Sequence, residues 1–412
     1  MKIVVVGSGG REHALAAVLG RDAEVVVTPG NPAIEGSVST SVDDLVAAGD
    51  VDLVVFGPEQ PLVAGHADRL RAKGVRVFGP GLEGARLEGS KAYMKMILEE
   101  ARLPTAKWES FTGDRLDDAL SYLATMKPPY VIKTDGLAAG KGVLVTDSLS
   151  EAELDVRAKL EGGSFGDAGQ RVVIEEGLSG PEVSVFAVCD GQRAVCLPAA
   201  QDFKRVGDGD SGPNTGGMGA WSPLPFIPEG FEAEVNKKFI EPTLAELRQR
   251  GIDYRGCIYA GFMLTEDGPK LLEYNVRFGD PDSQVVLMRM TSSLSELLAA
   301  AADGDLTKVA APTFSNEAAV LVVAASENYP IAPRIGDVIE GIDAAREVPG
   351  VTVLGAGVGQ RDGHLATAGG RVLNVIAIGE DTSKARELAY EAISKISWPG
   401  EHHRSDIAAA SV

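Results

Sequence analysis

The chain has 412 residues, and its 44% hydrophobic and 24% charged residues are typical of a globular protein with about three domains. Its 59 acidic residues against 39 basic ones give a formal net charge of −20, which argues against nucleic acid as a partner because that affinity comes mostly from lysine and arginine. No apolar run approaches the roughly 18 residues of a membrane helix, and the run after Met1 is too short for a signal peptide, so we expect a cytoplasmic protein without membrane contact.

Residues 1–88 alternate short apolar strands with helical stretches. The predicted strands are Ile3–Val6, Val25–Val27, Leu53–Phe56 and Val75–Phe78, and each ends in a turn with glycine or proline. Continuous apolar strands that alternate with helices indicate a parallel sheet with both faces covered. Ligands of such sheets bind beyond the carboxyl ends of the strands, where all four turns lie. We therefore predict an N-terminal parallel α/β domain with a ligand site at this edge.

The first of these turns, Gly7–Glu12, opens a helix, so its backbone N–H groups and the helix dipole could hold an anion. A dinucleotide fingerprint would need a third glycine where Glu12 stands, and the second strand ends at Pro29 without an acid for a ribose diol. Both departures argue against NAD. Arg11 would instead suit a terminal phosphate monoester, which it can bind through two hydrogen bonds. A tight turn without a ligand is an equal alternative.

From Ser90 the pattern changes. We predict a helix that carries Lys91 and Lys95, and then mainly strands and hairpins as far as about Thr265. Within this region the segment Gln201–Gly219 is polar, rich in glycine and too long for a simple connector. Loops of this length in compact proteins are usually functional or disordered, so we treat the segment as part of a site.

Two predicted strands, Tyr130–Lys133 and Val143–Val145, are joined by the long connection Thr134–Gly142. Two residues would suffice for a hairpin turn, whereas this connection is built largely of glycine and other small residues. Small residues let the backbone approach phosphate oxygens, and Lys133 and Lys141 bracket the loop. We predict a phosphate-binding flap in preference to a floppy hairpin loop. It is not a Walker A loop, since no Gly-Lys-Ser/Thr follows and no helix starts here.

The next candidate is the run Val172–Leu178, a strand that ends in Glu175 and Glu176, with Glu182 in the following strand. The backbone at a strand end can recognise an adenine edge through its N–H and C=O groups. A carboxylate such as Glu182 can accept hydrogen bonds from ribose hydroxyls. Alone this signal is weak, because glutamates at a strand end are usually just solvated.

The run Lys270–Arg277 is the most informative strand. Alternation places Glu273, Asn275 and Arg277 on one face. A carboxylate and an amide oxygen two residues apart suit Mg²⁺, which combines few protein ligands with phosphate oxygens. Arg277 would come next, able to stabilise a transferring phosphoryl group. The turn Phe278–Asp282 adds two carboxylates. The alternative is a polar, solvent-facing strand edge, which asparagine disfavours as a poor strand former.

Toward the C-terminus we predict a helix at Ser293–Ala302 and a β-rich segment with strands Ala319–Ala324, Val351–Leu354 and Val372–Ile378. This segment contains no cluster of convergent polar residues, so we expect a packing or lid domain. The tail after Glu401 is rich in alanine and is expected to fray.

Taken together, these motifs resemble the ATP-grasp superfamily, and within it the glycinamide ribonucleotide synthetases. The matching runs are Gly7–Ala14, Gly57–Leu62, Leu87–Tyr93, Val131–Val143, Val173–Glu176, Gln201–Gly219, Tyr259–Gly261 and Asn275–Pro281. They occur in family order across nearly the whole chain, to about Ile407. The run Asp202–Gly219 is specific to this family, whereas the flap alone would indicate only the superfamily.

The resemblance implies a multidomain fold of α/β and α+β type: an N-terminal parallel α/β substrate domain (1–88), a central ATP-grasp fold (89–308) with a mobile subdomain at about 105–176, and a β-rich C-terminal domain (309–412). It also implies an activity. ATP would drive the ligation of glycine to 5-phospho-D-ribosylamine through glycyl phosphate. The products would be glycinamide ribonucleotide, ADP and phosphate, in de novo purine biosynthesis.

The resemblance further implies site residues. For ATP these are Lys91, Lys133, Gly140, Lys141, Glu175, Glu176, Leu178 and Glu182. For the substrates they are Gly10, Arg11, Glu12, Asn31, Pro58, Glu59, Asp202, Lys204, Asn214, Gly217, Asp280 and Pro281. Mg²⁺ or Mn²⁺ would bind Glu273 and Asn275. The catalytic residues would be Arg277, Asp280 and Lys133. The turn with Arg11 would hold the 5-phosphate at a half-site distant from Arg277. Asp282 stands where glutamate is usual and is given no role.

Two other functions are considered. One is a carboxylase of the same superfamily that acts on a phosphoribosyl intermediate; the run Asp202–Gly219 argues against it. The other is a regulatory protein that binds a nucleotide without catalysis, which the presence of Glu273 and Asn275 argues against. The resemblance leaves open a transient contact with the upstream enzyme that makes phosphoribosylamine.

Overall fold

The computed structural model describes residues 1–137, 142–162 and 171–409. Its N-terminal sheet is parallel, as predicted, with the strand order β2-β1-β3-β4. The strands are β1 (Lys2–Gly7), β2 (Glu24–Pro29), β3 (Leu53–Phe56) and β4 (Val77–Phe78). The helices of this part are α1 (Gly10–Leu19), α2 (Val42–Ala47), α3 (Gln60–Val63), α4 (His66–Ala72) and α5 (Leu82–Gly89). Consecutive residues of β1, Ile3 to Val5, are fully buried, so both faces of the sheet are covered.

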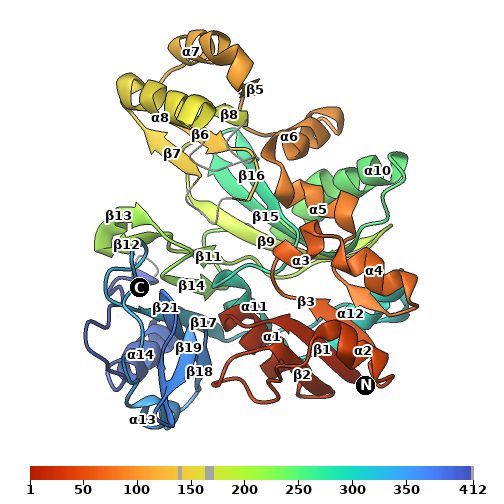
Figure 1. Cartoon of the computed structure of the whole chain (residues 1–412), viewed down its shortest axis with the longest axis vertical. Coiled ribbons are helices and arrows are strands. Elements are labelled where there is room, and N and C mark those ends of the chain that lie inside the picture. Colours follow the sequence, from red (N-terminus) through yellow and green to blue (C-terminus); the bar gives the residue numbers. More distant parts are fainter. Residues whose placement is uncertain (138–141, 163–170, 410–412) are drawn as a thin grey trace.

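A small unit with its own hydrophobic core stands apart from the rest at the top of Figure 1. Its antiparallel sheet has the order β5-β8-β6-β7, from β5 (Trp108–Thr112), β6 (Tyr130–Thr134), β7 (Val143–Thr146) and β8 (Arg171–Glu176). It also contains η1 (Gly113–Arg115), α7 (Leu116–Ala124) and α8 (Leu149–Gly162). The sequence prediction of mainly strands here underestimated these helices, because α8 buries few apolar side chains and leaves Leu154 exposed.

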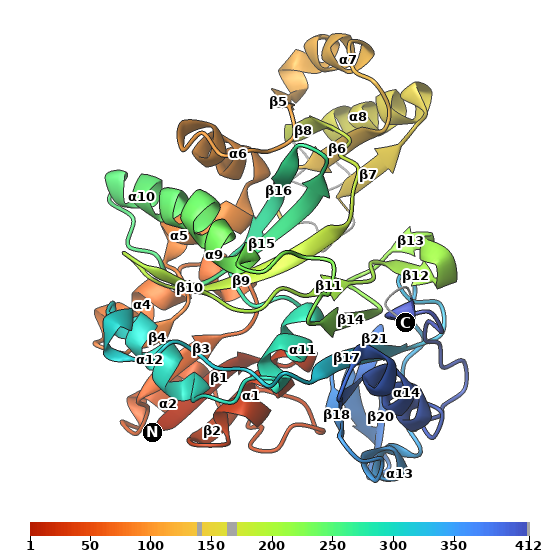
Figure 2. The same cartoon turned by 180° about the vertical axis from the view of Figure 1, so that it is seen from behind.

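The central sheet is antiparallel and has the order β10-β9-β15-β16. Its strands are β9 (Glu182–Asp190), β10 (Ala194–Cys196), β15 (Arg255–Thr265) and β16 (Gly268–Asn275). Helices around it are α6 (Lys91–Glu100), α9 (Phe231–Val235), the π-helix η4 (Asn236–Ile240), α10 (Glu241–Gln249) and α12 (Leu294–Asp303). Helix α12 packs on β4, β9 and β15, and thereby connects this sheet to the N-terminal sheet (Figure 2).

The third large sheet has the order β11-β14-β17-β21-β18 and joins two distant parts of the chain. Its strands are β11 (Gln201–Asp202), β14 (Gly219–Ser222), β17 (Ala318–Ala325), β18 (Val351–Gly355) and β21 (Arg371–Gly379). The predicted strands of the C-terminal segment are confirmed. The polar run Gln201–Gly219 therefore starts and ends at strands of this sheet, which fixes both ends of the loop.

Most of the remaining elements surround this third sheet, and one short 3-10 helix lies instead against α12. They are β12 (Arg205–Gly207), η3 (Asp208–Asp210), β13 (Ser211–Asn214), α11 (Asp282–Met288), η5 (Leu306–Lys308), α13 (Ile342–Arg346), β19 (Val358–Arg361), β20 (His364–Thr367) and α14 (Thr382–Ile393). Strands β12 and β13 form a hairpin within the polar run, and α14 packs on β17 and β21. Within the described ranges, no helix has the length and apolar character needed to cross a membrane.

The expectation of a frayed tail after Glu401 is wrong for the residues that the structure describes. Arg404 is 1% exposed and pairs with Asp210 and Asp406. Ile407 is fully buried, and the carboxylate of Asp208 accepts the backbone N–H of Ser405. Composition indicated fraying because alanine is common in the tail, but the anchoring comes from its charged residues. The tail thus fastens the β12–β13 hairpin.

Candidate active site

The end of β16 carries a chain of polar contacts. The amide of Asn275 donates to Glu273 Oε1 at 3.3 Å, and Arg277 Nη2 donates to Asn275 Oδ1 at 3.4 Å. The strand ends at Asn275, earlier than predicted, and is bulged where Gly261 and Phe262 of β15 pair with Glu273 and Leu271. The three side chains are nevertheless together, as the sequence predicted.

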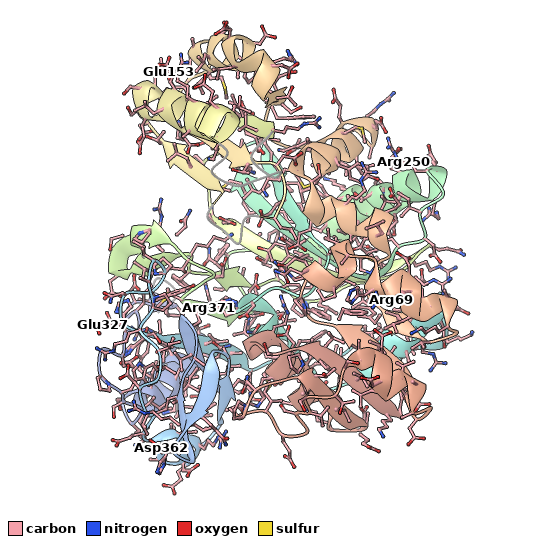
Figure 3. The ribbon with its side chains drawn as sticks, in the orientation of Figure 1. Arg69, Glu153, Arg250, Glu327, Asp362 and Arg371 are labelled. Atoms are coloured by element: carbon pink, nitrogen blue, oxygen red, sulfur yellow. The ribbon has the colours of Figure 1, made fainter. Side chains whose placement is uncertain are left out.

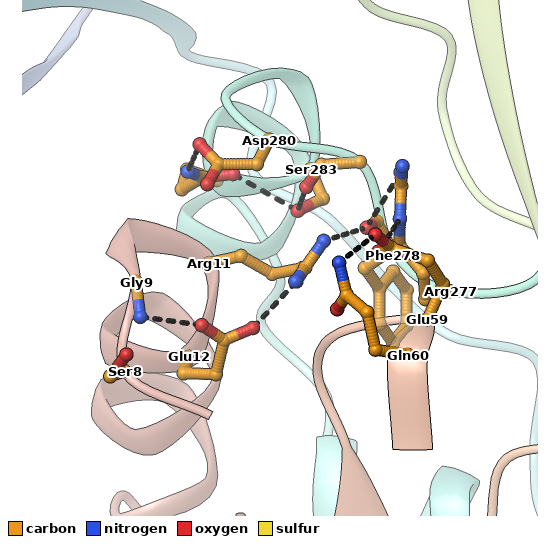
Figure 4. A network of polar contacts seen from close by, with 12 residues as sticks. Ser8, Gly9, Arg11, Glu12, Glu59, Gln60, Arg277, Phe278, Asp280 and Ser283 are labelled. Carbon is orange, nitrogen blue, oxygen red and sulfur yellow. Dashed lines mark hydrogen bonds and ion pairs between the residues drawn. The ribbon is translucent and has the colours of Figure 1, made fainter. Parts of the chain in front are cut away.

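Arg277 is held by acceptors from the N-terminal part of the chain. Its Nη2 donates to Glu88 Oε1 at 3.0 Å, and its Nε to Glu59 Oε2 at 3.4 Å. Burial lowers the pKa of Arg277, but the carboxylates of Glu88 and Glu59 raise it by more, so the guanidinium stays charged. Figure 4 shows Arg277 beside Glu59 and Gln60, whose side chains also hydrogen-bond to each other.

The glycine turn at the start of α1 holds a carboxylate of its own. Glu12 Oε2 accepts the backbone N–H of Gly9 at 2.6 Å, and Glu12 Oε1 accepts from Arg11 Nε at 2.6 Å. Arg11 Nη1 also donates to the carbonyl of Phe278 at 3.2 Å, and Arg277 Nη1 donates to the same oxygen at 3.4 Å (Figure 4). The two arginines expected at distant half-sites therefore meet at one carbonyl oxygen.

Asn31 links this turn to the C-terminal sheet. Its buried amide donates to the carbonyl of Ser8 at 2.8 Å and to that of Ala356 at 3.1 Å. Pro58 and Glu59 lie on the turn between β3 and α3, next to Arg277. The predicted substrate residues of the first 88 positions thus line neighbouring turns at the carboxyl edge of the parallel sheet.

A buried carboxylate lies between two lysines, one on β6 and one on α6. Glu175 pairs with Lys133 at 2.9 Å and with Lys95 at 2.8 Å, and all three side chains are under 10% exposed. Burial raises the pKa of Glu175, while Lys133 and Lys95 lower it by more; burial lowers the pKa of Lys95 to about 8. The Glu175 side chain is therefore occupied in positioning Lys133, and any contact with a nucleotide would come from the backbone.

Lys95 was not among the predicted site residues, although its spacing from Lys91 on one helix was a signal. Lys91 Nζ donates to the carbonyl of Gly136 at 3.2 Å, at the start of the flap. Glu176 accepts the backbone N–H of Lys107. The predicted flap residues Gly140 and Lys141 lie outside the described residues.

The polar run from β11 approaches the β16 edge with a second group of charges. Lys204 pairs closely with Glu182 and lies 3.7 Å from Asp202. Burial raises the pKa of Asp202 to about 7, against the lowering effect of Lys204. Burial also raises the pKa of Glu273, but Lys204 and the lysines of the flap side lower it by more. The carboxylate of Glu273 is therefore ionised at neutral pH.

Three further predicted residues, two of them in this run, lie in different surroundings. Gly217 has φ +108°, and a Cβ there would come within 2.3 Å of Pro281 Cδ, so the close approach requires glycine. Leu178 lies between β8 and β9, next to the small unit. Asn214 is exposed at the end of β13, away from the buried charges.

Asp280 is held from the C-terminal sheet, so this segment, in which no cluster of convergent polar residues was predicted, supplies one charged contact. Arg371 Nη1 lies 3.2 Å from Asp280 Oδ1 and donates to the carbonyl of Gly216 at 2.7 Å. Gln284 also donates to Asp280. Burial raises the pKa of Asp280, but Arg371 and Arg11 lower it by more. In Figure 3, Arg371 lies within the outline of the molecule, whereas Asp362 lies at its lower edge.

The donor set at the end of β16 fits a hard divalent cation. Glu273 offers an ionised carboxylate and Asn275 an amide oxygen, the few protein ligands that Mg²⁺ combines with phosphate oxygens. No group of three acidic, histidine or cysteine side chains suited to a metal occurs among the described residues. Glu273 and Asn275 are therefore the two side chains of this strand that could hold such a cation.

Three family models match the chain in succession. They are the N domain of phosphoribosylglycinamide synthetase at residues 1–88, its ATP-grasp (A) domain at residues 89–283 and its C domain at residues 319–410. The chain belongs to the phosphoribosylglycinamide synthetase family. It is therefore an ATP-using ligase, and the resemblance found in the sequence is confirmed.

Relatives match over their full length. The phosphoribosylamine–glycine ligase of Streptomyces coelicolor is 46% identical over 426 residues, which cover 99% of this chain and 99% of the relative. The crystal structure of phosphoribosylamine–glycine ligase from Thermotoga maritima has a TM-score of 0.85 at 35% identity, and covers 99% of this chain and 100% of that one. The N5-carboxyaminoimidazole ribonucleotide synthetase of the same organism has a TM-score of 0.64 at 15% identity, with coverage of 96% and 99%, which shows the fold alone.

Proposed function

We propose that this ligase joins glycine to 5-phospho-D-ribosylamine at the expense of ATP, giving glycinamide ribonucleotide, ADP and phosphate in de novo purine biosynthesis. The observation that carries the proposal is the contact chain Glu273–Asn275–Arg277, which lies beside the turns of the N-terminal sheet. It brings a cation site, a fixed guanidinium and a substrate edge together. The full-length likeness to phosphoribosylamine–glycine ligases supports the choice of substrates.

ATP would lie between the small unit and the central sheet. Lys91 and Lys133 would contact its phosphates, and the backbone around Glu175 to Leu178 would contact the base. Glu182 would accept from the ribose. Glu176, Gly140 and Lys141 stay proposed for the same ligand. Mg²⁺ or Mn²⁺ held by Glu273 and Asn275 would neutralise charge on the phosphate oxygens during transfer.

The chemistry proceeds in two displacements. A carboxylate oxygen of glycine attacks the γ-phosphorus of ATP, the bond to the bridging oxygen of ADP breaks, and glycyl phosphate forms. The amine of phosphoribosylamine then attacks the acyl carbon, phosphate leaves, and the nitrogen loses a proton to give the amide. Arg277 steadies the phosphoryl group during the first step because its positive charge is fixed in place. Asp280, ionised beside Arg371, holds the glycine ammonium.

The ribose side of the second substrate would face the turns of the N-terminal sheet and the polar run. For the 5-phosphate we propose Gly10, Arg11 and Glu12, with Glu12 fixing the orientation of Arg11. The remaining proposed contacts are Asn31, Pro58, Glu59, Asp202, Lys204, Asn214, Gly217 and Pro281. We also propose a cytoplasmic location and a transient contact with the enzyme that supplies phosphoribosylamine.

The test is phosphate release from ATP with glycine, measured with and without phosphoribosylamine. We expect full turnover only when both are present, and none when alanine replaces glycine. Release with bicarbonate in place of glycine would favour the carboxylase alternative. Binding of ATP without turnover on any acceptor would favour a regulatory protein.

A further inference from the structure

The guanidinium of Arg277 is almost completely engaged by the protein. An arginine offers five N–H donors. Four acceptors for them occur among the described residues: Glu59 Oε2, Glu88 Oε1, Asn275 Oδ1 and the carbonyl of Phe278. One donor is left for a ligand. The direction in which it points is set by the acceptors that take the other four.

Glu88 makes the shortest of these contacts and is itself fixed at two points. Its Oε1 accepts from Arg277 Nη2 at 3.0 Å, and its Oε2 accepts the backbone N–H of Val276 at 2.8 Å. The side chain of Glu88 is 7% exposed, and that of Arg277 is 18% exposed. One carboxylate thus holds both the backbone and the side chain at the point where β16 has just ended.

Two opposing effects act on the carboxyl of Glu88, and the net result is a raised pKa. Burial raises the pKa of Glu88, and Arg277 opposes that effect. Glu88 also belongs to α5, an element of the N-terminal part, whereas Arg277 follows the strand that carries Glu273. The contact therefore fixes the end of β16, which carries Glu273, relative to the N-terminal part of the chain.

We propose that Glu88 is a positioning residue for the ligase reaction: it orients Arg277 toward the transferring phosphoryl group and touches no substrate itself. This inference rests on the proposed function of Arg277. Glu59 does not duplicate the role, because its contact with Arg277 is longer, at 3.4 Å, and its carboxylate also accepts from Gln60.

Glu88→Gln is the informative substitution, since it keeps the shape of the side chain. Glutamine has one acceptor oxygen and one donor nitrogen. It can satisfy the Val276 N–H or the Arg277 guanidinium, but not both. We expect kcat to fall about 10-fold, less than the roughly 10²–10³-fold cost of losing a preorganised donor outright. The KM values for glycine and phosphoribosylamine should stay within about twofold, because the lost interaction acts in the transition state.

The matched control is Glu83→Gln on the same helix. Glu83 forms an exposed ion pair with Arg86 at 2.9 Å and lies away from Arg277. Glu83→Gln should leave kcat unchanged. The decisive measurement is a double-mutant cycle: in an Arg277→Ala background, Glu88→Gln should cause no further loss.

The Nη2–H resonances of Arg277, whose donor contacts Glu88, provide a readout that does not depend on activity. We expect slow hydrogen exchange in the wild-type protein and faster exchange in Glu88→Gln. Glu88→Asp, which keeps the charge but shortens the reach, should give intermediate exchange and kcat, and serves if the glutamine variant folds poorly. Wild-type kcat in Glu88→Gln, an equal loss in the Arg277→Ala background, or unchanged exchange would each overturn the inference. Absence of wild-type turnover with glycine would instead refute the proposed function, and the exchange measurement would still decide the role of Glu88.

Discussion

His13 leads to a prediction about pH that can be worked out quantitatively. It lies on α1, and its Nδ1 accepts the backbone N–H of Gly355 at 2.8 Å, across the contact between the N-terminal and C-terminal sheets. Burial lowers the pKa of His13 from 6.5 to about 4. The ring is therefore neutral in the folded protein at pH 7. Protonation of Nδ1 would break its hydrogen bond with the Gly355 N–H, a loss that a bond to the Gly355 carbonyl, 3.4 Å away, offsets only in part.

The sign of the effect follows from proton binding. Between pH 6.5 and about 4 the unfolded chain binds a proton at this histidine and the folded chain does not, so stability falls as pH falls. The loss is about 2 kcal/mol at pH 5 and about 3 kcal/mol once the pH is below the folded pKa. Above pH 6.5 the histidine contributes no pH dependence.

The assay compares urea unfolding of the wild-type protein and His13→Asn at pH 7.5 and pH 5. Asparagine places a carbonyl oxygen near the position of Nδ1 and does not titrate, so it preserves the acceptor without the proton. The difference between the two proteins cancels the other titrating groups. His364→Asn, at an exposed position on β20, is the control and should behave as the wild type. Equal losses in the wild-type and His13→Asn proteins on acidification would refute the reasoning.

Three further predictions concern the site and its supports. Glu273→Gln should weaken Mg²⁺ affinity by more than the roughly 10–100-fold typical of an outer-shell partner, measured as the Mg²⁺ concentration for half-maximal turnover. Lys95→Met should lower the free energy of unfolding in urea by about 1–3 kcal/mol, because Glu175 loses a charge-assisted hydrogen bond but keeps Lys133 as its counter-ion; an unchanged midpoint would mean that the Lys95–Glu175 pair adds nothing to stability. Arg404→Ala should raise the KM for phosphoribosylamine roughly tenfold, equivalent to about 1.4 kcal/mol, since the β12–β13 hairpin loses its clamp; steady-state kinetics with an unchanged KM would contradict this.

Local patterns in the sequence were sufficient for the elements that define the fold. The apolar strands Ile3–Val6 and Leu53–Phe56 form the parallel sheet, since hydrophobic periodicity depends on neighbours in the chain. The same holds for Glu273 and Asn275, whose spacing of two residues puts them on one face. The sequence alone was therefore enough to bring these two side chains together, and their proposed metal role rests on that.

Partners separated by long stretches of chain could not be predicted in this way. Glu88 and Arg277 are 189 residues apart, and Lys95 and Glu175 are 80 apart. Nothing in a local pattern distinguishes a glutamate that will pair with a buried arginine from one that stays solvated. For the same reason the sequence showed no cluster of polar residues in the β-rich C-terminal segment. Arg371 reaches the carbonyl of Gly216 only because β21 joins the same sheet as the strands that flank the polar run.

The glycine turn illustrates a different limit. Its geometry suggested an anion site, and an anion is indeed held there, but it is the carboxylate of Glu12 at the third position of α1. A glutamate at this position that reaches back to the N-terminal backbone is one half of a capping box. Because glycine, and not serine or threonine, stands at the N-cap three residues before Glu12, the sequence lacked the usual signature.

Four cations of the candidate site are each paired with a carboxylate of the protein. Arg277 is held by Glu88, Lys133 by Glu175, Lys204 by Glu182 and Arg371 by Asp280. A buried cation without a partner would be costly to the fold, and a partner removes most of that cost. Each pairing also fixes a positive charge before any ligand arrives, so little reorganisation is needed when phosphate or carboxylate enters. For the proposed anionic substrates, these acidic partners are what would let a protein with a net charge of −20 present fixed positive charge.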